Sequence, residues 1–135
     1  MTFILLFLMF APDIAALKSE PDLEKRSELA LANADRQVDA ARDAYQGGDL
    51  KRMQAALEEI RDSVNLSAES LEQAHKKARN NKYYKRAELK VRALLRRLSG
   101  FHDEVSAEDR KEIEAVRQRL QEVHDQLLAQ IMSKK

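Results

Sequence analysis

Apolar residues recur at alternating steps of three and four along most of the chain. This spacing keeps them on one face of a helix and is typical of helices that pack side by side as in a coiled coil. It predicts four amphipathic helices, at about 21–46, 50–79, 82–99 and 107–132. Their apolar seams are Leu31, Ala34, Val38, Ala41, Tyr45; Leu50, Met53, Leu57, Ile60, Val64, Ser67, Leu71, Ala74, Ala78; Tyr84, Ala87, Val91, Leu94, Leu98; and Ile113, Val116, Leu120, Val123, Leu127.

Residues that favour helix ends lie between these segments. Gly47 and Gly48 supply the backbone conformation found at helix C-termini, and Asp49 is a good N-cap for the second helix. Asn80-Asn81 is the expected end of the second helix, and Gly100 the expected end of the third. Ser106 stands three residues before Asp109, a spacing that resembles a capping box at the start of the fourth helix.

The short connections favour antiparallel neighbours. We therefore predict an all-α fold, an up-down-up-down antiparallel four-helix bundle formed by residues 17–135 as a single domain. In an alternative, the second and third helices merge across Asn80-Asn81 into an elongated three-helix hairpin. Composition agrees with the helical class, because the chain has three glycines and two prolines, both prolines within its first 21 residues. The absence of cysteine excludes disulfides and thiolate metal sites.

The first residues differ from the rest. Residues 2–12 read TFILLFLMFAP, which has no polar stripe and is too short for a bilayer span of roughly 20 residues. It fits the apolar region of a signal peptide, with cleavage expected after Ala16. We thus expect residues 1–16 to direct export to the periplasm or the exterior. No basic residue precedes the apolar run, and a cytoplasmic location follows if the segment is not a functional signal.

Two short patterns resemble known families. Glu72 and His75 have the Glu-x-x-His spacing of ferritin-like di-iron bundles, but those need a second copy, and Glu122 and His124 are one residue too close together. Residues 44–53 are similar to the helical hairpin of a tetratricopeptide repeat, without a second copy at the 34-residue period. Neither a nucleophile elbow nor a phosphate-binding loop is found, and His102 is expected in a solvated loop. We predict a non-catalytic protein without cofactor or metal.

Charge is segregated along the chain although the net charge is +1. Residues 76–97 contain ten basic residues and one acid, Glu88, a local excess of +9, while the other segments are acidic. In the heptad register of the third helix, the basic residues cover the outward face and one flank, with Glu88 and Leu95 on the other flank. The candidate binding residues are Lys82, Lys85, Arg86, Lys90, Arg92, Arg96 and Arg97.

Two interpretations of this basic stripe follow. It is either a solvated face balanced by acidic neighbouring helices or a docking surface for something anionic. For an exported protein, that partner is an acidic lipid headgroup, an envelope glycopolymer or an acidic protein. We expect a binding or structural role in the cell envelope. The alternatives are a cytoplasmic nucleic-acid-binding module, with Tyr83 as a stacking residue, and a coiled-coil subunit of a larger assembly.

Overall fold

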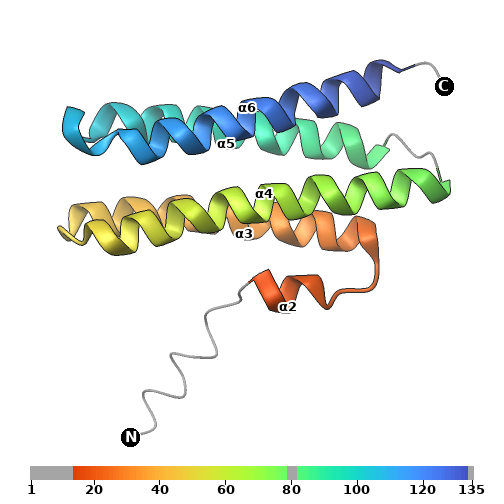
Figure 1. Ribbon diagram of the computed structural model, residues 1–135, viewed down its shortest axis with the longest axis horizontal. Helices are drawn as coiled ribbons and strands as arrows, with labels where there is room; N and C mark the ends of the chain where they lie inside the picture. The colour runs from red at the N-terminus through yellow and green to blue at the C-terminus, as the bar shows by residue number, and fades with distance from the viewer. Residues whose placement is uncertain (1–13, 79–81, 134–135) are drawn as a thin grey trace, which may run out of the picture.

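The computed structural model describes residues 14–78 and 82–133, without the side chains of residues 75–78. The predicted apolar run and the Asn80-Asn81 helix end lie outside the described residues. The helices are α2 (Ile14–Lys18), α3 (Leu23–Gln46), α4 (Leu50–Ala78), α5 (Lys82–Glu104), the 3-10 turn η1 (Ala107–Asp109) and α6 (Lys111–Met132) (Figure 1).

The four long helices run antiparallel in chain order, which confirms the predicted all-α four-helix bundle (Figure 1). Helices α4 and α5 are separate and lie in different layers, so the merged three-helix alternative is wrong. No helix among residues 14–78 and 82–133 is long and apolar enough to cross a membrane.

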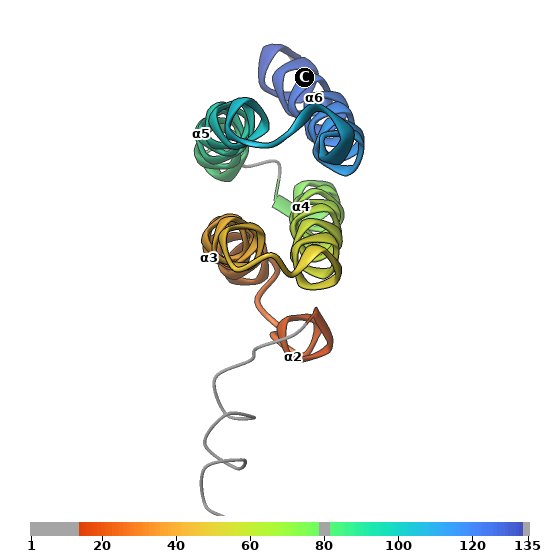
Figure 2. The ribbon, with the colours of Figure 1, turned by 90° about the vertical axis from the view of Figure 1, so that its left-hand side faces the viewer.

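The cross-section shows two stacked hairpins, α3 with α4 and α5 with α6 (Figure 2). Helix α5 lies beside α3, and α6 lies beside α4. Residues later in α3 contact residues later in α5, so these two neighbouring helices are parallel. The contacting pairs are Glu28 with Arg86, Asp35 with Arg97, and Arg42 with Glu104. Helices α4 and α5 therefore lie diagonally opposite each other in the cross-section.

The predicted seams form the core. Ala34, Ile60, Leu98 and Leu120 are almost completely inaccessible, as are most other seam residues. Among the described seam residues, Tyr45 is partly buried and Leu50, at the start of α4, is 42% exposed. Polar side chains also enter the α3–α4 contact, including Ser27 and Ser67, whose hydroxyls are 2.6 Å apart. The two hydroxyls are tolerated there because each is the hydrogen-bond partner of the other.

Helix α2 covers the outer side of the first hairpin. Its Leu17 packs against Ala30 of α3 and Leu66 of α4, and Ile14 lies against the same cluster. This places α2 on the side of the bundle opposite to the second hairpin (Figure 2). The cleavage position expected after Ala16 lies inside α2.

The predicted boundary between the third and fourth helices is wrong. Helix α5 continues through Gly100 to Glu104, because Phe101 and Val105 are buried and extend the apolar seam. Ser106 makes no side-chain cap and precedes η1, and α6 begins at Lys111 instead of residue 107.

His102 belongs to the last turn of α5 and not to a loop. Its side chain is only 16% exposed, and its Nε2 lies 2.9 Å from Glu114 Oε2 on α6. The expectation that His102 is solvated is therefore wrong.

Candidate anion-binding surface

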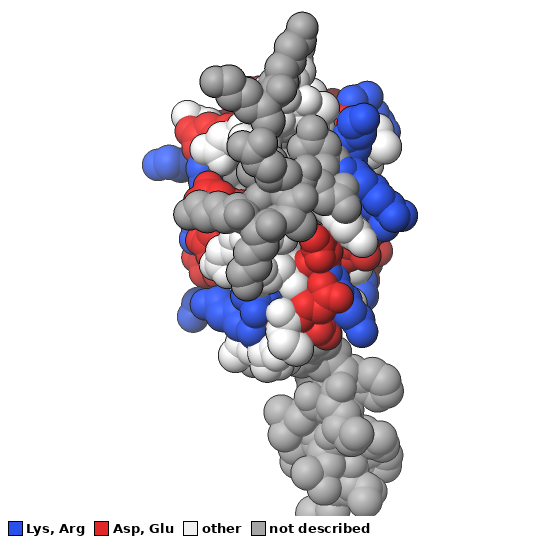
Figure 3. All heavy atoms as spheres, turned by 90° about the vertical axis from the view of Figure 1, so that its right-hand side faces the viewer, with Lys and Arg blue, Asp and Glu red and all other residues white. Residues whose placement is uncertain are grey.

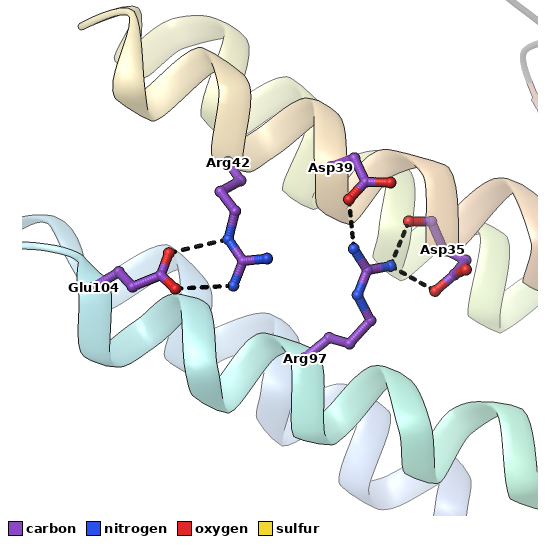
Figure 4. A network of polar contacts seen from close by, with 5 residues as sticks. All are labelled: Asp35, Asp39, Arg42, Arg97 and Glu104. Carbon is purple, nitrogen blue, oxygen red and sulfur yellow. Dashed lines mark hydrogen bonds and ion pairs between the residues drawn. The ribbon is translucent and has the colours of Figure 1, made fainter.

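One flank of α5 is neutralised by acids of α3. Arg97 Nη1 donates to the carboxylate of Asp35 at 2.6 Å and to its backbone carbonyl, and Nη2 donates to Asp39 (Figure 4). Burial opposes the charge of Arg97, but the two aspartates outweigh it and raise the pKa of the guanidinium. Arg42 makes the reverse pairing, since its Nε and Nη2 bind both carboxylate oxygens of Glu104 (Figure 4).

Arg86 and Lys82 are held at the start of the same helix. Arg86 donates to Glu28 at 2.9 Å, and its guanidinium lies 5.4 Å from the centre of the Tyr83 ring. The Lys82 ammonium is 5.6 Å from that ring. Two cations thus already contact the Tyr83 ring by cation–π interactions.

The other flank of α5 carries a buried carboxylate. Glu88 is 5% exposed and accepts hydrogen bonds from Arg92 Nε at 2.8 Å and from His124 Nε2 of α6 at 2.7 Å. Burial alone would raise the pKa of Glu88, but the hydrogen bonds and charges of Arg92 and His124 outweigh it and hold the pKa below its ordinary value.

The second ring nitrogen of His124, Nδ1, is buried without a hydrogen-bond partner among the described residues. Because the Glu88 carboxylate can only accept, it is Nε2 of His124 that carries a proton and donates to it. Sequence reasoning missed this cluster, because nothing in the heptad pattern says which helix faces the Glu88 flank.

Three cations of the basic stripe remain without an acidic partner among the described residues: Lys85, Lys90 and Arg96. All three are exposed. Leu89 stands next to Lys90 and four residues after Lys85, and it is 58% exposed. The basic stripe is thus divided into cations that pair with acids and an outer face that carries Lys85, Arg96 and the exposed Leu89, with the free Lys90 at its border with α3.

Two grooves border this outer face. Between α3 and α5, a groove of about 520 Å³ is lined mainly by apolar side chains, including Leu31, Ala87 and Leu89, with Arg86 and Lys90 at its edge. The second groove, about 540 Å³, lies between α5 and α6 and is lined by six polar or charged residues and Leu95, which contribute much of its surface through their apolar carbon atoms. Elsewhere the charges are mixed, as on the end of the bundle shown in Figure 3, where basic and acidic side chains are interspersed.

The residues considered for a di-iron site do not assemble. Glu72 is exposed on α4, Glu122 forms an ion pair with Arg119, and His124 is taken by Glu88; the His75 side chain lies outside the described residues. Within the described part of the chain, no group of three or more His, Asp or Glu side chains is placed to hold a metal ion.

Comparisons of the chain with protein-family models, curated proteins and solved structures give no match.

Proposed function

We propose that this protein is a non-catalytic component of the cell envelope that binds anionic lipid surfaces through the outer face of α5. The observation that carries this proposal is the position of Leu89, a leucine 58% exposed between the unpaired cations Lys85 and Lys90. An apolar side chain within a cationic face is suited to the boundary between lipid headgroups and acyl chains.

The neighbouring apolar groove supports a lipid over other anionic partners. It offers apolar contact along Leu31, Ala87 and Leu89, with Arg86 and Lys90 at its edge. A lipid combines a negative headgroup with an apolar chain, so it can contact both the cations at the edge of the groove and its apolar lining. The apolar run at residues 2–12 supports export, which would bring the protein to such surfaces.

A nucleic acid is less well supported as the partner. Single-stranded nucleic acids are bound by aromatic rings that are free to stack on bases. Tyr83 is the aromatic residue expected for that role, and its ring already contacts Lys82 and Arg86. The hypothesis of a coiled-coil subunit loses the support that an elongated three-helix hairpin would have given it, because α4 and α5 are separate helices.

Vesicle co-sedimentation tests the proposal, with neutral phosphatidylcholine vesicles compared with vesicles that also contain phosphatidylglycerol. A lysine near an anionic membrane surface contributes about 1 kcal/mol. The double variant Lys85→Gln/Lys90→Gln should therefore lose about 2 kcal/mol, or roughly 30-fold in affinity. Leu89→Ser should weaken binding at high salt as well as at low salt, since apolar contact is not screened.

Matched controls lie on other helices. Lys51 and Arg52 are exposed on α4 without acidic side-chain partners among the described residues, and Leu29 is 38% exposed on α3. Lys51→Gln/Arg52→Gln and Leu29→Ser should bind like the wild type. Equal losses in the control variants, or no binding of the wild type to anionic vesicles at low salt, would refute the proposed function.

A further inference from the structure

The groove between α5 and α6 gathers hydrogen-bond donors from both helices. Arg92 and Arg96 enter it from α5, and Arg117 enters it from α6. Ser99 adds a hydroxyl, and Leu95 adds a partly buried apolar contact. Three arginines thus line one groove, and arginine keeps its charge at every physiological pH.

These arginines are unequally satisfied. Arg92 is held by Glu88, so its position is fixed but its charge is offset. Arg96 and Arg117 have no acidic partner within the described part of the chain. Glu88 also binds His124, which lines the same groove. The buried acid thus pairs with Arg92 and His124, and the guanidinium groups of Arg96 and Arg117 remain available for a ligand.

We propose that the α5–α6 groove is a binding site for a phosphate group, held by Arg96 and Arg117 across the two helices. The guanidinium fork matches two oxygens of a tetrahedral oxyanion, which makes arginine well suited to bidentate phosphate binding. Leu95 lines the same groove and offers an apolar contact to the organic part of a phosphomonoester.

This site shares Arg96 with the outer face of α5 described above, but its other residues are different. Arg117 lies on α6, outside the basic stripe, and Lys85, Leu89 and Lys90 do not line this groove. A protein that does not bind phosphatidylglycerol vesicles could still bind phosphate here. Each proposal can thus fail without the other.

Titration of the full chain with inorganic phosphate and with glycerol 3-phosphate, followed by amide chemical shifts, tests the site. We expect saturable shifts at residues 92–99 and 117–124, with a Kd near the millimolar range. Arg117→Gln and Arg96→Gln should each weaken binding about tenfold, the effect of one lost charge-assisted contact. Arg36→Gln is the matched control, since Arg36 is an exposed arginine on α3 without an ion pair among the described residues.

A second arm distinguishes a soluble phosphomonoester from a lipid headgroup. Vesicles with phosphatidic acid display the same phosphomonoester on a membrane, and binding that depends on Arg117 would identify the lipid as the source. Binding of glycerol 3-phosphate alone would identify a soluble ligand. The proposal is overturned if wild-type shifts do not saturate, or if all three arginine variants lose affinity equally while thermal unfolding shows that they remain folded.

Discussion

The buried carboxylate of Glu88 makes a sharp prediction about stability. Glu88→Gln keeps the size of the side chain and removes its charge. Arg92 and His124 both donate to the same carboxylate oxygen, Oε2, and the amide oxygen of glutamine can take its place. The variant should therefore keep weaker, uncharged hydrogen bonds and lose most of the electrostatic attraction within the cluster.

The size of the loss follows from burial. Breaking a buried ion pair costs about 3–5 kcal/mol when both partners are buried, and a hydrogen bond to a charged group contributes about 1.5–3 kcal/mol. The Glu88 side chain is 7% exposed, but that of Arg92 is 50% exposed and can turn to water. We therefore expect Glu88→Gln to lower the free energy of unfolding by about 2 kcal/mol near neutral pH, and the melting temperature by roughly 8 °C.

The pH dependence tests the cause. Because the pKa of Glu88 is lowered in the folded protein, its contribution is complete above the ordinary glutamate value of 4.5 and is lost as the pH falls through the lower folded-state pKa. Urea unfolding at several pH values should show the gap in the free energy of unfolding between wild type and Glu88→Gln narrowing as the pH is lowered below 4.5. Glu58→Gln, at an exposed position of α4, should show little difference at any pH. A constant gap between about pH 6 and pH 3 would show that packing, and not the charge, is responsible.

Three further changes test other parts of the fold by chemical unfolding. Leu120→Ala, at a residue with 0% exposure, should cost about 2–5 kcal/mol through the cavity it leaves, and a loss below about 1 kcal/mol would mean that the core at this position is loose. Gly100→Ala should stabilise by about 0.5–1 kcal/mol, since the new Cβ would meet no heavy atom closer than Arg42 Nη2 at 3.9 Å; destabilisation would mean that Gly100 is not helical. Arg97→Ala should cost about 1 kcal/mol at low salt and less at high salt, because it leaves Asp35 and Asp39 without their shared partner, and a loss that does not depend on salt would contradict an electrostatic role.

The sequence predicts the helices well because burial follows directly from apolar spacing. The prediction fails at Gly100, where the expected helix end relied on the preference of glycine for helix C-termini. A glycine inside a helix costs about 0.5–1 kcal/mol, whereas burying a side chain such as Phe101 contributes about 1.5–3 kcal/mol. Phe101 and Val105 are 0% and 2% exposed. Burial of these side chains contributes more free energy than the glycine costs, so the helix continues through Gly100.

The Glu88 cluster could not be predicted in the same way. Heptad spacing fixes which face of a helix is apolar, but not the order of the helices in the cross-section. Glu88 is buried because its flank of α5 faces α6, where His124 is the partner. From the sequence, Glu88 was a single acid among ten bases, and its spatial partner lies 36 positions along the chain.

The charges beside the seams, however, do carry information on how α3 and α5 are oriented. In the heptad registers of the two helices, Asp35 and Arg42 occupy the same flanking position of α3 one heptad apart, as Arg97 and Glu104 do on α5. The observed parallel arrangement pairs Asp35 with Arg97 and Arg42 with Glu104. If α5 ran in the opposite direction, Arg42 would face Arg97 and Asp35 would face Glu104. Exposed ion pairs contribute at most about 1 kcal/mol each. Exchanging two attractive pairs for two repulsive pairs, however, doubles the free-energy difference between the two orientations of α5. Flanking charges select the orientation of helices in coiled coils by this means. Part of the positive charge of α5 therefore serves to orient α5 in the bundle. Only the cations that this pairing leaves free are candidates for binding a ligand.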